Sequence, residues 1–469
     1  MIFSSIFFIF VFLPITLILY YLVPFKLKNF VLLVVSLIFY AWGEPVYVFL
    51  MIFSIVINYV SGLEIESYRK QGKMQQAKTA FWVTLVVNLL VLGFYKYYGF
   101  FVSNLNLILP FKIPYHELAL PIGISFYTFQ TLSYVIDVYK GSLAAQRNLI
   151  TFGSYVTMYP QLIAGPIVRY SDVEKQLSKR DICWSKFSEG VSWFLTGLGK
   201  KVLIANNMGL VCDAILAMKA SETSALTAWI GAFAYTMQIY FDFGGYSDMA
   251  IGLGKMLGFD FIKNFDYPYI SKSITEFWRR WHISLSSWFK EYVYIPLGGN
   301  RVSTPKAIRN LMIVWCLTGL WHGAAWNFIA WGLYYGVLLI FEKYIFKKVL
   351  DKLPAALQHV YAMVLVMIGW VLFAAPSLSR AISFIGSMFG MGAGLVDSLG
   401  FYYFKTTFIL AIIAILCSTP KLYKTFMAYV YTRKEFGNIL YIGAYVLIFA
   451  ISVAYLVNAT YNPFLYFRF

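Results

Sequence analysis

Charged residues are scarce in this 469-residue chain, where Asp, Glu, Lys and Arg together make up 13% of the sequence. Soluble globular proteins carry about 25% of these residues. Hydrophobic residues make up 60%, and the mean hydropathy is +0.68. The shortage of charge therefore excludes a string of soluble domains and predicts an integral membrane protein with many spans.

Cysteine, histidine and the common catalytic motifs are scarce as well. The four cysteines, Cys183, Cys212, Cys316 and Cys417, show no CxxC spacing, and the chain has four histidines. We therefore expect no metal site and no disulfide framework. The sequence contains no P-loop, Rossmann glycine pattern, HExxH or GxSxG, so ATP-driven transport and the common hydrolase mechanisms are not supported.

Acidic residues are fewer than basic ones, which leaves a net charge of +17. The positive charges lie in short connectors between apolar runs, as the positive-inside rule predicts for cytoplasmic loops. We expect no nucleic acid partner, and we expect some of the excess to attract membrane lipid headgroups or an anionic substrate. The connectors assigned to the cytoplasm are 24–29, 62–80, 169–186, 255–309, 343–352 and 421–434. Those assigned to the outside are 43–45, 216–224 and 376–400, and the C-terminus follows at the outer face.

Apolar runs long enough to cross about 30 Å of hydrocarbon recur along the chain. The first is read as a retained span because it has no basic n-region and no cleavage site. Two further stretches, 99–117 and 149–168, are interrupted by proline and glycine, which predicts re-entrant or half-membrane helices around a central chamber. The prediction is an all-α, polytopic single domain over 1–469 with roughly 11–13 transmembrane helices. The expected spans are 2–23, 30–42, 45–61, 80–98, 118–138, 187–214, 226–254, 308–320, 324–342, 358–375, 402–419 and 437–457.

One histidine stands in an apolar segment, LTGLWHGAAWNFIAWGLYYG (317–336). The stretch 309–342 would span about 50 Å as a helix, whereas two crossings need about 60 Å. It is therefore expected to turn back inside the membrane, with His322 and Gly323 near the apex. Burial disfavours a positive charge, so a neutral imidazole here would suit a general base or a nucleophile. The alternative is a structural histidine satisfied by a backbone carbonyl or a hydroxyl.

A second histidine, His282, lies in SITEFWRRWHISLSSWFKEYVYIPLGGNR (273–301). Ser273 and Glu276 fit a helix-capping box. Large side chains then recur at steps of three and four residues, which predicts one face of an amphipathic helix in the membrane interface. This helix is interpreted either as an interfacial anchor or as the basic rim of a cytoplasmic entry. The face consists of Trp278, Trp281, Leu285, Trp288 and Tyr292.

Two other segments combine polar or aromatic residues with an apolar setting. Asp242 and Asp248 lie in the glycine-rich stretch 240–259, where unpaired carboxylates would be costly. They are expected either to orient an imidazole or to pair with Arg or Tyr, and we favour the structural pairing. The tail YNPFLYFRF (461–469) is typical of an aromatic anchor at the membrane interface.

Several of these blocks resemble the signature blocks of the membrane-bound O-acyltransferase (MBOAT) family. The resemblance is carried by EFWRRWHISLSSWFKEYVYIPLGGNR, LWHGAAWNFIAWGLYYG and YFDFGGYSDMAIG, and also by LPIGISFYTFQTLSYVIDVYKG (120–141) and QLIAGPIVRY (161–170). It is densest over 118–342. The blocks are most similar to those of the bacterial branch, the membrane subunits of alginate and peptidoglycan O-acetyltransferases.

The resemblance implies an MBOAT fold in the bacterial inner membrane and acyl transfer from a cytoplasmic thioester to an extracytoplasmic acceptor. His322 corresponds to the family's essential histidine and His282 to its second one. The implied donor substrate is acetyl-CoA, with no permanently bound cofactor. The implied acceptor is a polysaccharide such as alginate or peptidoglycan, reached through an SGNH-type outer partner. FLYFRF is similar to a C-terminal motif of envelope acylation systems, in which Tyr466 would carry the acyl group.

Residues that would bind the donor follow from this expected chemistry. The basic side chains Arg279, Arg280, Lys290 and Arg301 would attract the phosphates of coenzyme A. Trp321 and Asn327 are candidate donors of hydrogen bonds to the oxyanion. Two alternatives remain open: D-alanyl transfer from a carrier-protein thioester to teichoic acid, and export of a polysaccharide or lipid-linked sugar. Exporters often show internal duplication, which this sequence lacks.

Overall fold

The computed structural model describes residues 1–163, 165–458, 461–463 and 465, apart from the side chain of residue 434. Within these ranges the secondary structure is helical and contains no strand, which confirms the prediction of an all-α protein. The chain divides into two compact units. The first contains Met1–Phe194 and Met249–Ile262, and the second contains Leu195–Asp248 and Lys263–Phe469. Each unit is described separately below.

Seven helices in the described part of the chain are long and apolar enough to cross a membrane, and a shorter apolar helix covers Phe8–Leu22. The predicted spans at 118–138, 187–214, 226–254 and 308–320 also coincide with helices. These four segments are not among the seven helices. The chain is therefore a multi-pass membrane protein. The seven helices are α2 (Phe25–Gly43), α3 (Tyr47–Lys70), α4 (Met74–Ile108), Trp326–Leu350, α17 (Ala355–Ala374), α19 (Ser398–Cys417) and Glu435–Asn458.

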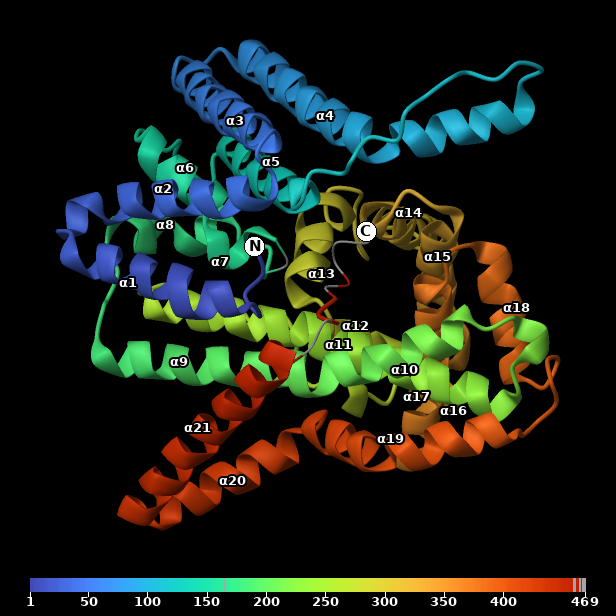
Figure 1. The fold of residues 1–469 in the computed structure, drawn as a ribbon. Coiled ribbons are helices and arrows are strands. Elements are labelled where there is room, and N and C mark those ends of the chain that lie inside the picture. Colours follow the sequence, from blue (N-terminus) through green and yellow to red (C-terminus); the bar gives the residue numbers. More distant parts are fainter. Residues whose placement is uncertain (164, 459–460, 464, 466–469) are drawn as a thin grey trace. The chain divides into compact units, whose positions relative to one another are not determined.

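The first unit is built on helices that pack around α5 (Ile124–Lys140) (Figure 1). The side chains of α5 are almost all buried. Helix α3 packs against both α4 and α5, and α2 packs against α6. Asn58 and Asn88 join α3 to α4 through two reciprocal amide hydrogen bonds of 3.0 Å each. The unit also contains η1 (Phe8–Phe12), α1 (Leu13–Leu22), α6 (Leu149–Thr157), α7 (Tyr159–Leu162), α8 (Tyr170–Ser178) and the start of α9 (Trp184–Gly199).

The two interrupted stretches have different outcomes. The predicted break at 99–117 is wrong in its first half, because α4 continues through Gly99 as far as Ile108. Residues 109–123 are not helical, and Asn106 fastens their start by exchanging two hydrogen bonds with the backbone of Ile113 (2.7 and 3.0 Å). The predicted interruption of 149–168 is confirmed, since α6 and α7 are short helices separated by Met158.

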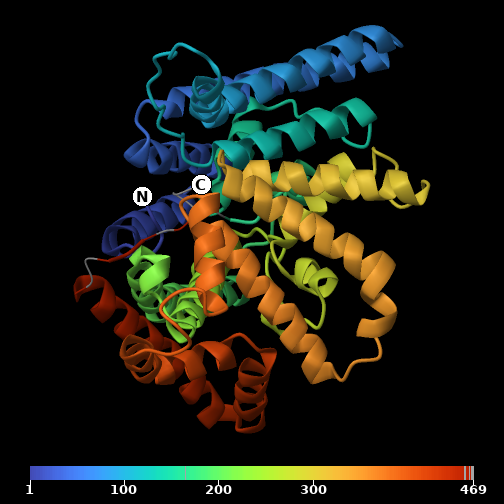
Figure 2. The same cartoon turned by 90° about the vertical axis from the view of Figure 1, so that its right-hand side faces the viewer.

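The second unit packs α15 (Trp326–Phe341) against both α14 (Thr304–His322) and α17, and Figure 2 shows these helices in yellow to orange. The unit also contains other helices, both short and long, which come before and after α14, α15 and α17 in the chain or between them. They are η2 (Lys200–Ala205), α10 (Asn206–Ala217), η3 (Ala220–Glu222), most of α11 (Ala225–Met256), η4 (Pro268–Ile270), α12 (Ile274–Arg280), α13 (Ile283–Phe289), η5 (Lys290–Tyr294), η6 (Glu342–Phe346), α16 (Lys347–Leu350), α18 (Leu378–Met388), α20 (Pro420–Thr432) and α21 (Lys434–Asn458).

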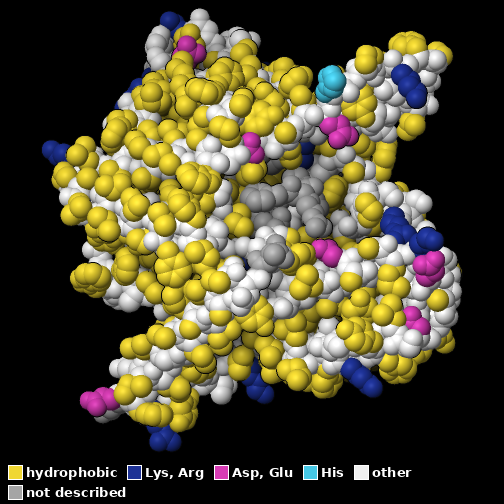
Figure 3. Space-filling view, viewed as in Figure 1, with side chains coloured by type: hydrophobic (Ala, Val, Ile, Leu, Met, Phe, Trp, Pro, Cys, Tyr) yellow, Lys and Arg dark blue, Asp and Glu magenta, His cyan; other side chains and the backbone are white. Residues whose placement is uncertain are grey.

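The surface of the first unit is apolar over its outer helices. Figure 3 shows hydrophobic side chains covering the visible faces of α2, α3 and α4, with few charges among them. Phe49 on α3 and Leu90 on α4 are 72% and 65% exposed. Side chains of this kind would be costly in water, so these faces suit contact with lipid.

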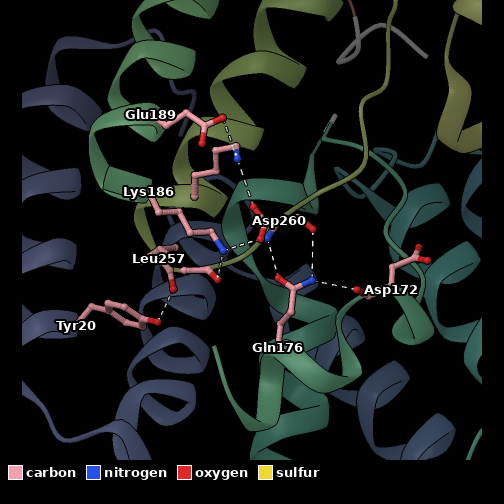
Figure 4. A network of polar contacts seen from close by, with 9 residues as sticks. Tyr20, Asp172, Gln176, Lys186, Glu189, Leu257 and Asp260 are labelled. Carbon is pink, nitrogen blue, oxygen red and sulfur yellow. Dashed lines mark hydrogen bonds and ion pairs between the residues drawn. The ribbon is translucent and has the colours of Figure 1, made fainter. Parts of the chain in front are cut away.

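A polar network closes the end of the first unit, at the connector that follows α11 (Figure 4). Lys186 on α9 and Lys255 on α11 approach the Asp260 carboxylate to 2.6 and 3.3 Å. The Gln176 side chain of α8 accepts a hydrogen bond of 2.7 Å from the Asp260 backbone N–H. Burial alone would raise the pKa of Asp260, but hydrogen bonds and charges from both lysines outweigh burial and lower it. The network joins three helices at one aspartate.

Candidate active site

His322 lies at the end of α14, and the chain reverses direction over residues 323–325 before α15 begins at Trp326. The predicted turn at this histidine is therefore confirmed. Small residues bring the two helices into backbone contact. A Cβ atom at Gly319 would meet the carbonyl oxygen of Phe328 at 2.4 Å, and one at Gly332 would meet that of Trp315 at 2.3 Å. This close approach fixes the position of the turn and of His322.

Aromatic rings surround the His322 imidazole on several sides. Its ring centroid lies 5.0 Å from that of Trp321, 5.0 Å from that of Trp331 and 5.2 Å from that of Phe373, with nearly perpendicular planes. The histidine is 6% exposed. Packing of this kind leaves little rotational freedom, so the ring is held in one orientation.

A pocket in the second unit opens onto His322. Among the described residues that line it, His322 has the only ionisable side chain, and the others are apolar or aromatic. Such walls exclude water and suit a small uncharged group better than a charged one. The sequence pattern singled out Trp281 and His322 but not the other described lining residues, most of which lie far from His322 in the sequence. These are Ile239, Phe243, Trp331, Trp370, Phe373 and Leu465.

His282 lies close to His322, and the two ring centroids are 6.4 Å apart. Its Nδ1 lies 3.1 Å from Oδ1 of Asn264, which also accepts a hydrogen bond of 2.9 Å from the Ser284 hydroxyl. A carbonyl oxygen accepts only, so Nδ1 carries the proton and Nε2 is left as the basic nitrogen. Burial lowers the pKa of His282 to about 3, so this imidazole is neutral near pH 7. Asn264 was not predicted as a site residue, because only the fold brings it here.

The prediction of one continuous helix that begins after Ser273 and ends at Pro296 is wrong. Helix α12 ends at Arg280, and His282 adopts a left-handed conformation with φ of 44° before α13 begins. The cause is a longer-range pairing: Ile283 N–H donates to the Asn264 carbonyl (2.9 Å) and Asp266 N–H donates to the Arg280 carbonyl (3.0 Å). These bonds replace helical ones, and the kink aims His282 at the pocket region. A left-handed non-glycine residue is typical of functional sites.

The large side chains of this segment are buried inside the protein. Trp278 packs edge-on against Trp315 (4.6 Å) and Tyr335 (4.9 Å), and Trp281 packs against Trp370 (4.7 Å). All five residues of the predicted face are buried. The expected placement in the membrane interface is therefore wrong for this face, which forms part of the core around the pocket.

The start of α12 is held by two caps. The Ser273 hydroxyl accepts from the Glu276 N–H (2.9 Å), as predicted, but the Glu276 carboxylate accepts from Lys272 instead of completing the box at Ser273. The buried carboxylate of Glu342 accepts from the N–H groups of Ile274 (2.6 Å) and Thr275 (2.9 Å). A carboxylate at a helix N-terminus is favourable, so Glu342 fixes α12 in place. It was missed because it lies far away in the sequence.

The predicted donor-binding cations differ in their surroundings. Arg279, Lys290 and Arg301 have exposed side chains. Arg280 is half-buried and pairs with Glu276 (3.0 Å) and Asp266 (3.3 Å), so much of its charge is already neutralised. The first three are therefore better placed to meet an anionic substrate than Arg280 is.

The remaining candidate residues are placed as follows. The Trp321 ring packs against both histidines, at 5.0 Å from His322 and 6.0 Å from His282. Asn327 is buried and donates a hydrogen bond of 3.0 Å to the carbonyl of Ala375, so it fastens α15 to the end of α17. It is not among the residues that line the pocket. Tyr466 lies outside the described residues.

Asp242 and Asp248 are paired, as predicted, but their partners are lysines and not Arg or Tyr. Asp242 Oδ1 lies 2.6 Å from Nζ of Lys201, and Asp248 Oδ2 lies 2.6 Å from Nζ of Lys200. The consecutive lysines in the apolar stretch 187–214 were the signal that could have identified this pairing. Neither aspartate lines the His322 pocket.

A family model, that of the membrane-bound O-acyltransferase family, matches residues 59–385 and so includes both histidines. The chain belongs to the MBOAT family. MBOAT membership makes it an O-acyltransferase. Among its relatives are two proteins described as a probable alginate O-acetylase. The one from Azotobacter vinelandii is 46% identical over 407 residues, which is 85% of this chain and 80% of that protein. The one from Pseudomonas aeruginosa is 45% identical over 407 residues, which is 85% of this chain and 77% of that protein.

More distant relatives of this MBOAT chain act on cell-wall polymers according to their names. The peptidoglycan O-acetyltransferase of Helicobacter pylori is 35% identical over 428 residues, which is 83% of this chain and 80% of that protein. The teichoic acid D-alanyltransferase of Bacillus subtilis is 31% identical over 248 residues, which is 49% of this chain and 62% of that protein.

Proposed function

We propose that this protein transfers an acetyl group from cytoplasmic acetyl-CoA across the bacterial inner membrane for O-acetylation of an extracytoplasmic polysaccharide. The observation that carries the proposal is His322, the only ionisable side chain among the described residues lining an apolar pocket. The high similarity to probable alginate O-acetylases supports acetyl as the acyl group and an alginate-like polysaccharide or peptidoglycan as the acceptor.

The proposed reaction is an acyl transfer with balanced bonds and protons. The acetyl C–S bond of the thioester breaks, and a C–O bond forms with the attacking hydroxyl. A neutral His322 takes the proton from this hydroxyl, and the proton then neutralises the departing thiolate. The apolar walls keep water away from the thioester, which limits wasteful hydrolysis.

His282, whose ring lies 6.4 Å from that of His322, is proposed to support this step. Its Nδ1 proton is committed to Asn264, so Nε2 can accept a proton or a hydrogen bond in the reaction region. The exposed cations Arg279, Lys290 and Arg301 are proposed to attract the phosphates of coenzyme A. No cofactor is proposed to remain bound between turnovers.

On the outer side, we propose that Tyr466 relays the acetyl group to an SGNH-type partner, which acetylates the polymer. The support is positional: Leu465, which precedes Tyr466 in the chain, lines the His322 pocket. A phenol oxygen attached to an acetyl group forms an ester that remains activated for a second transfer.

The test is acetyl transfer from radiolabelled acetyl-CoA by the full-length protein in liposomes, with His322→Ala and Tyr466→Phe alongside. We expect label on the wild-type protein, none with His322→Ala, and none retained with Tyr466→Phe. If Tyr466→Phe passes acetyl groups to an outer partner at the wild-type rate, the relay is wrong and the acetyl transfer proposal stands alone.

A second candidate is D-alanyl transfer from a carrier-protein thioester, which the similarity to the Bacillus subtilis teichoic acid D-alanyltransferase favours. That match covers about half of this chain, whereas the matches to probable alginate O-acetylases cover 85%. Supplying D-alanyl carrier protein in place of acetyl-CoA to the same liposomes separates the two donors. An exporter of polysaccharide would transfer neither group.

A further inference from the structure

A fully buried ion pair lies between η2 and α11 of the second unit. Nζ of Lys201 and Oδ1 of Asp242 are 2.6 Å apart, and each side chain is 2% exposed. Burying two charges costs several kcal/mol of hydration, which is recovered only when the remaining donors and acceptors also find partners. The identity of those partners therefore indicates what the pair is for.

Both partners of the pair contact the backbone of the C-terminal segment. Oδ2 of Asp242 accepts a hydrogen bond of 2.9 Å from the N–H of Leu465. Lys201 Nζ donates to the carbonyl oxygen of Pro463. Two further contacts precede these in the chain: Tyr461 donates to Asp213 (2.6 Å), and Asn206 donates to Asn462 (3.2 Å). Residues 461–465 are thus attached at four points to the helices η2, α10 and α11.

The attachment places the tail at the proposed reaction site. The side chain of Leu465 is 3% exposed and lines the same pocket as His322. The pair contacts backbone atoms of the tail. It therefore fixes the position of the tail along the chain direction and does not depend on which side chains the tail carries. If the segment were shifted by one residue relative to the pair, the side chains of its described residues would move by about 3.5 Å.

A second ion pair nearby provides a natural comparison. Lys200 and Asp248 are also 2.6 Å apart and come from the same two elements, η2 and α11. The described tail residues form no hydrogen bond or ion pair with either of them. Charge pairing between η2 and α11 therefore does not by itself explain why the Lys201–Asp242 pair is buried beside the tail.

We infer that Lys201 and Asp242 form a seat that positions the C-terminal segment at the His322 pocket. The inference rests on the proposed acyl transfer and names two positioning residues for it, neither of which touches the reacting atoms. The seat holds Leu465 in the pocket wall and fixes the position of the described residues 461–463 that precede it.

The seat can be tested without any assay of activity. Leu465→Cys is introduced into the full-length protein with its four native cysteines replaced by serine, and its reaction with a small membrane-permeant maleimide is followed in liposomes. Asp242→Asn should raise the labelling rate at least about tenfold, because an unpaired buried lysine no longer holds the tail. Asp248→Asn, the matched control, should change the rate less than about twofold. Equal rates for the two variants would overturn the seat.

Two additional variants guard against general unfolding. Asp242→Asn leaves a buried charge unpaired, so Lys201→Met with Asp242→Leu removes both charges and preserves the packing of the helices. This double variant should keep a single symmetric size-exclusion peak and still show fast labelling. Lys201→Arg, which retains the positive charge, should label more slowly than the double variant does. Slow labelling in the double variant would contradict the inference.

Acetyl transfer is then measured in proteins that keep Leu465 and the native cysteines. The inference expects Asp242→Asn and the double variant to lose at least about tenfold in transfer, with Asp248→Asn near the wild-type rate. Fast labelling with unchanged transfer would overturn the positioning role. A third outcome is that Asp242→Asn labels fast but the wild-type protein transfers no acetyl group. This outcome would support the seat and contradict the proposed function.

Discussion

At the scale of single residues, a neutral imidazole in an apolar pocket suits acyl transfer, because the base must be unprotonated when the hydroxyl attacks. The sequence predicted a turn at His322, and the structure has the turn there, between α14 and α15. Asn264, Glu342 and the Lys201–Asp242 pair were not found as site residues. Each acts across more than 15 positions of sequence, and local patterns do not say which residues meet over such distances, although two consecutive lysines in an apolar stretch indicate that each needs a partner.

The buried His282 makes stability depend on pH. Burial lowers its folded-state pKa to about 3, whereas a histidine in an unfolded chain has a pKa of about 6.5. Between these values the unfolded chain binds more protons, so this contribution to stability is present above about pH 6.5 and is lost as the pH falls towards 3. Lowering the pH from 7.5 to 4.5 should therefore lower the Tm of the wild type more than the Tm of His282→Gln. The two decreases should differ by at least about 2 °C, measured by thermal unfolding in detergent.

The control for this pH dependence is His116→Gln, because His116 is exposed. It should keep the wild-type dependence of Tm on pH. If His282→Gln and His116→Gln follow the same curve as wild type, the neutral buried state of His282 is wrong.

The exposed cations near α12 and η5 should act on donor binding and not on chemistry. Arg279→Ala combined with Arg301→Ala should raise KM for acetyl-CoA several-fold with kcat nearly unchanged, because long-range attraction of phosphates acts before the reaction. The effect should shrink as salt rises. Initial rates at two ionic strengths measure it, with Lys421→Ala as the control for loss of an exposed positive charge elsewhere. A fall in kcat at constant KM would contradict the assignment.

At the scale of elements, periodicity predicted which segments are helical but not where two of them end. The pattern over 273–301 is that of one helix, yet pairing of residues 264–266 with 280–283 interrupts it at His282. Similarly, Gly99 does not break α4, because a glycine inside a helix costs only about 1 kcal/mol. The turn between α14 and α15 was predictable because length alone excluded two full crossings.

The hairpin of α14 and α15 depends on glycine where the two backbones touch. Gly332→Ala should force the helices apart, since its Cβ would lie 2.3 Å from a carbonyl oxygen of Trp315. Overpacking of this kind typically costs about 1–3 kcal/mol, so we expect a lower Tm and a loss of acetyl transfer of at least about tenfold.

Gly443→Ala in α21 is the matched control for this substitution. A Cβ there meets no atom within 4 Å, and alanine favours the helix. Its Tm and transfer rate should equal or exceed those of wild type. A Gly332→Ala protein with unchanged Tm and rate would show that the hairpin does not fix His322.

At the scale of the whole molecule, composition and hydropathy were sufficient to predict a polytopic helical membrane protein. The division into two compact units was not visible in the sequence, because two of its three boundaries fall inside the helices α9 and α11, and only the one after Ile262 falls in a connector. The resemblance to MBOAT proteins gave the reaction class, which composition and periodicity alone do not.

The central claim is that the protein transfers acetyl groups with His322 as the base. It is tested most directly by incubating radiolabelled acetyl-CoA with liposomes that contain the full-length protein, wild type beside His322→Ala, at equal amounts of correctly assembled protein. We predict labelled protein or labelled outer partner with wild type and a loss of at least about 100-fold with His322→Ala. Equal labelling with the two proteins would contradict the account.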